Sequence, residues 1–257
     1  MTLAPATTGR PEVLAARGTV ADRWGAFLRS LPPGGCELEV SILFADVRGS
    51  TALAERLTPT AFSHLMRRFY QLAGGVVARF DGSVDRLVGD GVVALFLPGI
   101  AGPLHAGRAI DAAHALLAAV ARDTGGHPVG VGVHTGIAWL GPVPRLDGRV
   151  DFTALGDAVN VTAHLCSAAG AGEIAISEEA VRAAGRVHPA PAPRAVRLKR
   201  RRARVAARFC GAPARAASSQ SCFGAADGVS KSFRYSPYPS SSSFSSGMKR
   251  SDAELMQ

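Results

Sequence analysis

Two aspartates stand where their carboxylates can act together on a metal ion. Asp46 directly follows an alternating apolar run at residues 38–44, and Asp90 lies in the turn Gly89-Asp90-Gly91 between two β-rich runs. Paired carboxylates bind divalent cations well, and oxygen ligands favour Mg²⁺ or Mn²⁺. Taken singly, Asp46 is better explained as a helix cap and Asp90 as a turn former. Their joint occurrence at two strand ends favours a metal site.

Small residues follow Asp46 and lead into a predicted helix. The stretch Gly49-Ser50-Thr51 can expose backbone N–H groups at the helix start, where the helix dipole also favours phosphate. The sequence contains no GxxxxGK[ST] motif, which excludes a dedicated P-loop. A phosphate-binding turn and an ordinary capped turn are both consistent with this stretch.

The elements around these residues follow a recognisable order. Alternating and helical apolar spacings predict strand, helix, strand, strand, helix and strand, with additions at the C-terminal side. This order predicts an α+β fold of the ferredoxin-like split βαβ type, an antiparallel sheet with helices packed on it. The first strand is central in such a sheet, and the strand after the Asp90 turn lies beside it. We therefore expect Asp46 and Asp90 to lie close together.

Composition divides the chain into three parts. Residues 1–35 form an N-terminal extension with one short helix expected near Val20–Leu31, residues 36–188 form the folded domain, and residues 189–257 form a basic, Ser-rich tail expected to be disordered. The formal net charge of the chain is +9. Residues 191–257 contain 13 Lys and Arg against 3 Asp and Glu, whereas residues 1–190 contain 16 against 17. The basicity belongs to the tail, which argues against a nucleic-acid-coating protein.

Cysteine usage and hydropathy bear on location. The four cysteines form no CxxC pair, which argues against a structural zinc site and a disulfide scaffold and suits a reducing cytoplasm. The longest charge-free stretch, Thr124–Pro144, is interrupted by several glycines and prolines. We therefore expect a cytoplasmic protein without a membrane span.

Three segments together carry a resemblance. Phe44–Thr51, Asp85–Phe96 and Asp151–Asn160 resemble, in this order, the three motifs of class III adenylate/guanylate cyclase catalytic domains, and the resemblance covers about residues 37–182. It implies that residues 36–188 form a nucleotide cyclase catalytic domain. It also implies a head-to-tail homodimer with active sites at the interface between the two chains.

The resemblance assigns the first half of the site to one chain. Asp46 and Asp90 would hold two Mg²⁺ or Mn²⁺ ions, with the Val47 carbonyl as a further ligand. The ribose 3′-hydroxyl of ATP would attack the α-phosphorus, which gives 3′,5′-cyclic AMP and pyrophosphate. Positioning and charge neutralisation supply most of the catalysis in such two-metal chemistry.

The opposite chain would supply the second half. Arg86 stands where the family commonly has a base-selecting Lys, and Thr153 stands at the other base-selecting position, which holds Thr in one bacterial subgroup. Neither position carries the Glu and Cys types linked with guanine, so ATP is favoured. Asn160 would orient the ribose.

One position departs from the family pattern. His164, four residues after Asn160, stands where the family has an Arg that stabilises charge on the transferring phosphate. A His side chain is shorter than Arg and is only partly charged near neutral pH. The alternative reading is therefore a catalytically silent cyclase-homology domain used for dimerisation or regulation.

Overall fold

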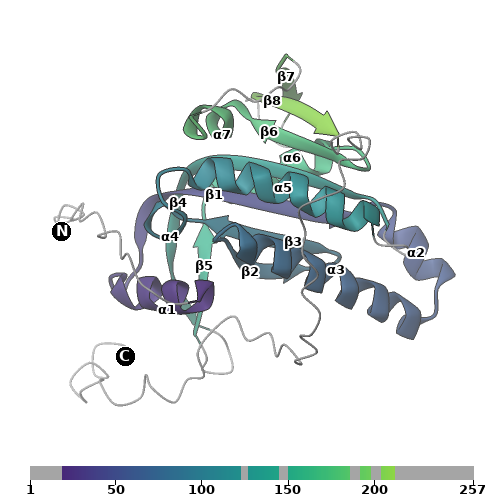
Figure 1. Cartoon of the computed structure of the whole chain (residues 1–257), viewed down its shortest axis with the longest axis horizontal. Coiled ribbons are helices and arrows are strands. Elements are labelled where there is room, and N and C mark those ends of the chain that lie inside the picture. Colours follow the sequence, from purple (N-terminus) through teal and green to yellow (C-terminus); the bar gives the residue numbers. More distant parts are fainter. Residues whose placement is uncertain (1–18, 123–126, 145–149, 186–191, 198–203, 212–257) are drawn as a thin grey trace, which may run out of the picture.

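Within the residues that the structure describes, an eight-stranded sheet forms the centre of the protein (Figure 1). The computed structural model describes residues 19–122, 127–144, 150–185, 192–197 and 204–211. The strand order is β2-β3-β1-β4-β6-β8-β7, and β5 pairs with β4 off this path. The strands are β1 (Cys36–Val47), β2 (Ser83–Val88), β3 (Gly91–Phe96), β4 (Val129–Pro144), β5 (Val150–Leu155), β6 (Glu173–Ser177), β7 (Arg194–Arg197) and β8 (Arg204–Gly211).

The order around β1 confirms the predicted ferredoxin-like fold. β1 pairs antiparallel with β3 on one side and with β4 on the other. Each of the two crossover connections therefore skips one strand, as in a split βαβ unit. One pair departs from the antiparallel expectation, because β4 and β6 run parallel.

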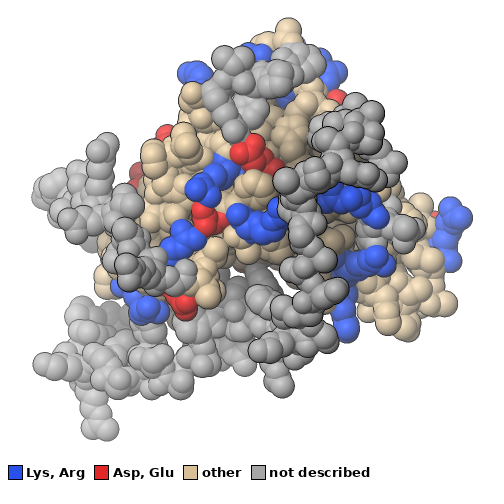
Figure 2. All heavy atoms as spheres, viewed as in Figure 1, with Lys and Arg blue, Asp and Glu red and all other residues tan. Residues whose placement is uncertain are grey.

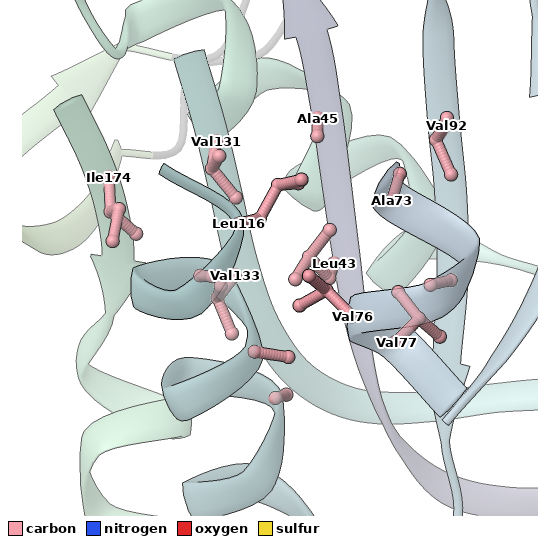
Figure 3. Close-up of a cluster of buried hydrophobic side chains, with 14 of the residues drawn as sticks. Leu43, Ala45, Ala73, Val76, Val77, Val92, Leu116, Val131, Val133 and Ile174 are labelled. Atoms are coloured by element: carbon pink, nitrogen blue, oxygen red, sulfur yellow. The ribbon is translucent and has the colours of Figure 1, made fainter. Parts of the chain in front are cut away.

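Helices cover the sheet on both faces. The helices are α1 (Val20–Ser30), α2 (Ser50–Arg56), α3 (Pro59–Arg79), α4 (Pro98–Ala101), α5 (His105–Arg122), α6 (Asp157–Ala168) and α7 (Glu178–Ala183). On the first face α3 and α5 pack over β1, β3 and β4, and Ala73, Val76 and Val77 of α3 approach Leu43 and Val92 (Figure 3).

α3 begins where the sequence predicts, because the Thr58 side chain accepts the Ala61 N–H at 3.2 Å and Pro59 occupies the first turn.

The second face is covered by α1 and α6. Trp24 and Phe27 of α1 are buried against strand residues that include Ile42 and Leu95. Thr19 and Asp22 form a capping box that begins α1, so the helix expected in the N-terminal extension is present. From residue 19 onward this extension is thus part of the packed domain.

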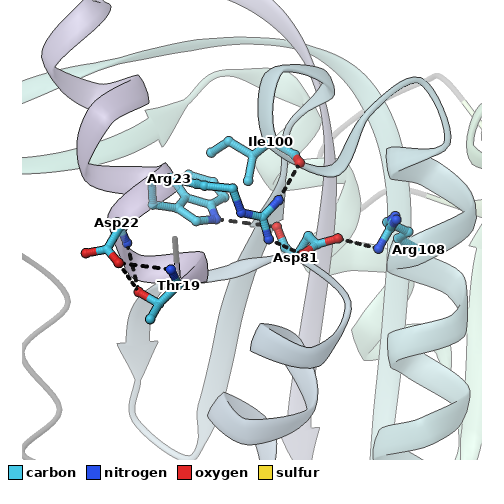
Figure 4. A network of polar contacts seen from close by, with 7 residues as sticks. Thr19, Asp22, Arg23, Asp81, Ile100 and Arg108 are labelled. Carbon is cyan, nitrogen blue, oxygen red and sulfur yellow. Dashed lines mark hydrogen bonds and ion pairs between the residues drawn. The ribbon is translucent and has the colours of Figure 1, made fainter. Parts of the chain in front are cut away.

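A polar network fastens α1 to the rest of the molecule (Figure 4). Arg23 of α1 forms an ion pair with Asp81, and Arg108 of α5 pairs with the other oxygen of the same carboxylate. Arg23 also donates to the Ile100 carbonyl at 3.1 Å. Asp81 thereby links the N-terminal helix to an element from the opposite face of the sheet.

The expectation of a disordered tail from residue 189 is wrong for two segments. β7 and β8 form a hairpin, and β8 pairs with β6 so that the sheet continues past the predicted boundary. Val196 and Phe209 point inward against α6, and the Arg194 guanidinium lies 4.1 Å from the centre of the Phe209 ring. The remainder of the predicted tail, including residues 198–203 and 212–257, lies outside the described residues.

Replacing Phe209 with alanine should test whether β8 belongs to the domain. We expect Phe209→Ala to lower the free energy of unfolding by about 3 kcal/mol, because a large buried ring is lost from the contact with α6. Arg204→Ala, at an exposed position of the same strand, should change it by less than about 0.5 kcal/mol. Urea titration of the full chain measures both, and equal midpoints for the two variants would contradict the packing of β8.

The described surface shows mixed charge and no candidate membrane span. Acidic side chains lie among basic ones on the face that carries α3 and α5 (Figure 2). In the described ranges, no helix is both long enough and apolar enough to cross a bilayer.

Candidate functional site

The ends of β1 and β3 bring the two predicted metal ligands together. Asp46 lies in register with Gly91 of β3, and Asp90 immediately precedes Gly91 in the turn from β2. The Val47 N–H lies 3.4 Å from the Asp90 carbonyl oxygen, so Val47, the third predicted ligand, also belongs to this edge. Burial and the neighbouring Asp90 carboxyl raise the pKa of Asp46, and the nearby Arg48 opposes them.

These groups fit a hard divalent cation. Two neighbouring carboxylates repel each other, so a cation placed between them is favourable. Within the described ranges no group of three or more His, Cys, Asp or Glu gathers at one point, so the protein offers two carboxylates and a backbone carbonyl. Mg²⁺ commonly takes one or two carboxylates and completes its octahedron with water and substrate phosphates. The donor set therefore suits a metal that arrives with a nucleotide.

Arg48 lies beside Asp46, and the sequence pattern assigned it no role. Its Nη1 lies 3.0 Å from Asp46 Oδ2, and its Nη2 donates to the Cys166 carbonyl on α6. A Cβ at Gly130 would lie 2.1 Å from this guanidinium, so glycine at that position leaves room for it. Arg48 thus holds the Asp46 carboxylate and the end of α6 in one arrangement.

The predicted phosphate-contacting turn begins α2. Gly49 is the N-cap residue with φ of 72°, a conformation that glycine adopts without strain. Ser50 and Thr51 are the first residues of the helix, and among the described residues no side chain caps it. The first-turn N–H groups of α2 therefore follow directly on the strand that carries Asp46.

The two predicted base-selecting residues are joined through a third. Thr153 of β5 donates its hydroxyl hydrogen to Asp85 Oδ2 at 3.0 Å. The Arg86 Nε forms an ion pair with the same oxygen at 3.0 Å, and Arg86 Nη2 donates to the Ala154 carbonyl at 2.9 Å. The structure therefore brings Arg86 and Thr153 together, as the sequence predicts, but with Asp85 between them.

A β-bulge explains how Asp85 reaches this position. The register between β2 and β3 shifts between Val84 and Arg86, which leaves Asp85 as the extra residue without a cross-strand partner. Regular alternation would direct adjacent side chains to opposite faces, whereas a bulge redirects one of them. The Asp85 side chain is 1% exposed, and burial raises its pKa to about 6 against the opposing effects of Arg86 and Thr153.

α6 carries the two remaining candidates. Asn160 is exposed and His164 is half-buried, one helical turn further along. Among the described residues, no hydrogen bond or ion pair joins either of them to Asp46 or Asp90. The structure thus brings Asp46 and Asp90 together, and Arg86 together with Thr153. Asn160 and His164 lie on α6.

Gly132 sets the distance between α6 and the sheet. A Cβ there would lie 2.4 Å from the Cys166 backbone nitrogen and 2.5 Å from the Thr162 carbonyl oxygen. We expect Gly132→Ala to destabilise the protein by about 1 to 3 kcal/mol, because the backbone of α6 must move. Gly74→Ala, in open space within α3, should instead stabilise it by roughly 0.5 to 1 kcal/mol. Thermal unfolding of both variants measures these opposite shifts, and a stabilised Gly132→Ala would contradict the close contact.

Known proteins show the same fold and related sequences. An adenylate cyclase of Anabaena cylindrica is 30% identical over 155 residues, which is 54% of this chain and 31% of that protein. Adenylate cyclase 1 of Rhizobium meliloti is 31% identical over 135 residues, which is 49% of this chain and 20% of that protein. The chain thus matches less than a third of the length of these relatives.

Solved structures point the same way. The guanylyl cyclase Cya2 superposes with a TM-score of 0.65 at 25% identity, covering 73% of this chain and 100% of that one. The adenylyl cyclase CyaB from P. aeruginosa gives 0.62 at 25% identity, covering 68% and 95%. The sequence model of the adenylate and guanylate cyclase catalytic domain matches residues 37–193. The match covers more than half of the chain, which therefore belongs to the adenylate and guanylate cyclase catalytic domain family.

Proposed function

We propose that the protein is an adenylate cyclase that converts ATP to 3′,5′-cyclic AMP and pyrophosphate. The observation that carries this proposal is the approach of Asp46 to Asp90 at two adjacent strand ends. The family membership and the adenylate cyclases among its relatives support the reaction class. Arg86 and Thr153, with no Glu and Cys pair, support ATP as the substrate and the subgroup with Thr at a base-selecting position.

The chain's own residues have distinct tasks in this reaction. Asp46, Asp90 and the Val47 carbonyl bind the metal, and the N–H groups at Gly49, Ser50 and Thr51 contact the triphosphate. Bound there, Mg²⁺ or Mn²⁺ supplies positive charge that acidifies the ribose 3′-hydroxyl and neutralises the phosphates. The 3′-oxygen forms a bond to the α-phosphorus while the bond from that phosphorus to the bridging oxygen breaks. Pyrophosphate leaves with the electron pair, and the hydroxyl proton is released.

A second copy of the chain completes the site. Arg86 and Thr153 contact the base, Asn160 orients the ribose, and His164 faces the phosphates from that copy. Exposed apolar side chains on the strands near these residues support a homodimer. Leu87 and Val88 on β2 are 46% and 47% exposed, and Leu155 on β5 is 44% exposed. Burying such residues against a partner is favourable in proportion to the apolar area removed from water.

The purified protein with Mn²⁺ and ATP provides the direct test. We expect cyclic AMP and pyrophosphate to form in equal amounts, with a specific activity that rises with protein concentration as dimers assemble. Chromatographic separation of the products measures both. Absence of product from a protein shown to be dimeric and to bind Mn²⁺ would overturn the proposal.

Two observations support a second candidate, a silent cyclase-homology domain used for dimerisation or regulation. His164 stands in place of the phosphate-contacting Arg, and a half-buried imidazole reaches less far than a guanidinium. Arg48 also pairs with Asp46 and so competes with a cation for that carboxylate. The same assay separates the two candidates.

A further inference from the structure

We propose that Asp85 is a specificity-determining residue that makes the Thr153 hydroxyl a hydrogen-bond acceptor toward the base and thereby selects adenine over guanine. This inference rests on the proposed cyclase function and concerns the base-binding part of the same site. It assigns a role to Asp85, which is not one of the proposed metal or phosphate ligands.

The bonds at Asp85 determine which way the Thr153 hydroxyl points. An ionised carboxylate accepts hydrogen bonds and donates none, whereas a hydroxyl has one hydrogen and two lone pairs. Thr153 therefore gives its single hydrogen to Asp85 Oδ2. What the hydroxyl has left for a ligand is lone-pair density.

Arg86 completes the pattern with donors. Its Nε pairs with Asp85 and its Nη2 donates to the Ala154 carbonyl, which fixes the plane of the guanidinium. The third nitrogen, Nη1, has no partner among the residues that the structure describes. A guanidinium can only donate. The site thus offers one donor group beside one acceptor.

Adenine matches this pattern and guanine opposes it. Adenine has an acceptor at N1 beside a donor, the 6-amino group, so N1 can face Arg86 while the amino group faces Thr153. Guanine has a donor at N1 and an acceptor at O6, which places like groups opposite each other. A site whose buried polar groups are left unpaired by the wrong substrate rejects it strongly.

The surroundings of Asp85 keep its carboxylate buried and bonded to Thr153. Asp85 lines a small pocket whose other walls include Trp24 and Leu28 of α1 and Phe152 of β5. Its side chain is 1% exposed, so the carboxylate is shielded from solvent. The charged groups that act on it are Arg86, on the same strand, and Asp151 on β5. The Ala154 backbone N–H also favours the ionised carboxylate, and together with the Thr153 hydroxyl and Arg86 it opposes the effect of burial on the pKa of Asp85. The pKa of about 6 leaves Asp85 ionised at pH 7.5.

The test compares kcat/KM for ATP and for GTP, both with Mn²⁺, in four proteins. Asp85→Asn introduces an amide that can donate to Thr153, which frees the hydroxyl to donate to a base. We expect the ATP to GTP ratio to fall about tenfold or more in Asp85→Asn and in Thr153→Val, with no further fall in the double variant. Asp151→Asn, which changes a charge beside Asp85 but leaves its bond to Thr153, should keep the wild-type ratio. A variant that weakens metal or phosphate binding lowers kcat/KM for ATP and for GTP alike, so this effect cancels in their ratio.

A pH series gives the same test without a variant. Below about pH 6 a protonated Asp85 can donate to Thr153, so the wild-type ratio should fall between about pH 7.5 and 5.5 while that of Asp85→Asn stays flat. The pH series of the wild type also tests the role of Asp85 if Asp85→Asn fails to fold. We expect it to fold, because the change removes a buried charge at constant shape.

The possible outcomes separate the inference from the proposed function. An unchanged ratio in Asp85→Asn together with a flat wild-type pH series overturns the role of Asp85 and leaves the cyclase intact. A wild type that prefers GTP overturns the role of Asp85 together with ATP as the proposed substrate, but leaves the cyclase reaction intact. If no protein forms product, calorimetric affinities for Mn²⁺-ATP and Mn²⁺-GTP replace the kinetic ratio. A wild type that binds neither nucleotide overturns the cyclase proposal itself.

Discussion

Replacing either Asp46 or Asp90 with alanine should abolish cyclic AMP formation, a loss of about a thousandfold or more. Each carboxylate contributes negative charge that a hard cation needs, and the two lie at adjacent strand ends where neither can substitute for the other. Mn²⁺ affinity in the presence of ATP, measured by electron paramagnetic resonance, should fall in parallel. That readout stays informative even if the wild type turns over slowly.

The control for this prediction is Glu55→Ala. Glu55 is an exposed carboxylate on α2, close in sequence to the same edge, and its removal should leave both activity and Mn²⁺ binding unchanged. Circular dichroism checks that all three variants fold. Full activity in Asp46→Ala or Asp90→Ala would exclude the two-carboxylate site.

Replacing His164 with arginine should raise turnover by about 10- to 1,000-fold. A guanidinium can contact phosphate oxygens with two donors and carries a permanent charge, whereas an imidazole offers one well-placed donor and a shorter reach. His164 is half-buried on α6, one turn after the exposed Asn160, so a longer side chain at this position can extend toward solvent. The measurement is cyclic AMP formation at a protein concentration high enough for dimers.

Ser167→Arg provides the matched control for His164→Arg. Ser167 is exposed on the same helix and has no proposed contact with the phosphates. Ser167→Arg therefore adds the same charge to α6 away from the proposed site. It should leave turnover unchanged. An inactive wild type restored by His164→Arg would mean that one substitution silenced an otherwise sound site. No activity in either protein, with dimers and metal binding shown, would favour the regulatory domain.

Local sequence patterns were sufficient for the central sheet and for the meeting of Asp46 with Asp90. Alternation at residues 38–44, the Asp-Gly turn at Asp90 and the cap at Thr58 each act within a few residues, so their outcome depends little on the rest of the chain. Given the split βαβ order, the meeting of Asp46 and Asp90 follows from the pairing of β1 with β3. This part of the candidate site was therefore predictable.

Other features depended on contacts between distant segments. The strands β7 and β8 lie in Arg-rich sequence that has little strand character by itself, and they form because β6 offers a free edge and α6 an apolar face for Phe209. α1 is likewise buried by a sheet face that its own sequence does not reveal. Regular alternation along β2 would place the Asp85 and Arg86 side chains on opposite faces of the sheet. The bulge between β2 and β3 instead brings them into an ion pair. A strand's register is decided by its partner, so tertiary structure alone placed Asp85 between Arg86 and Thr153.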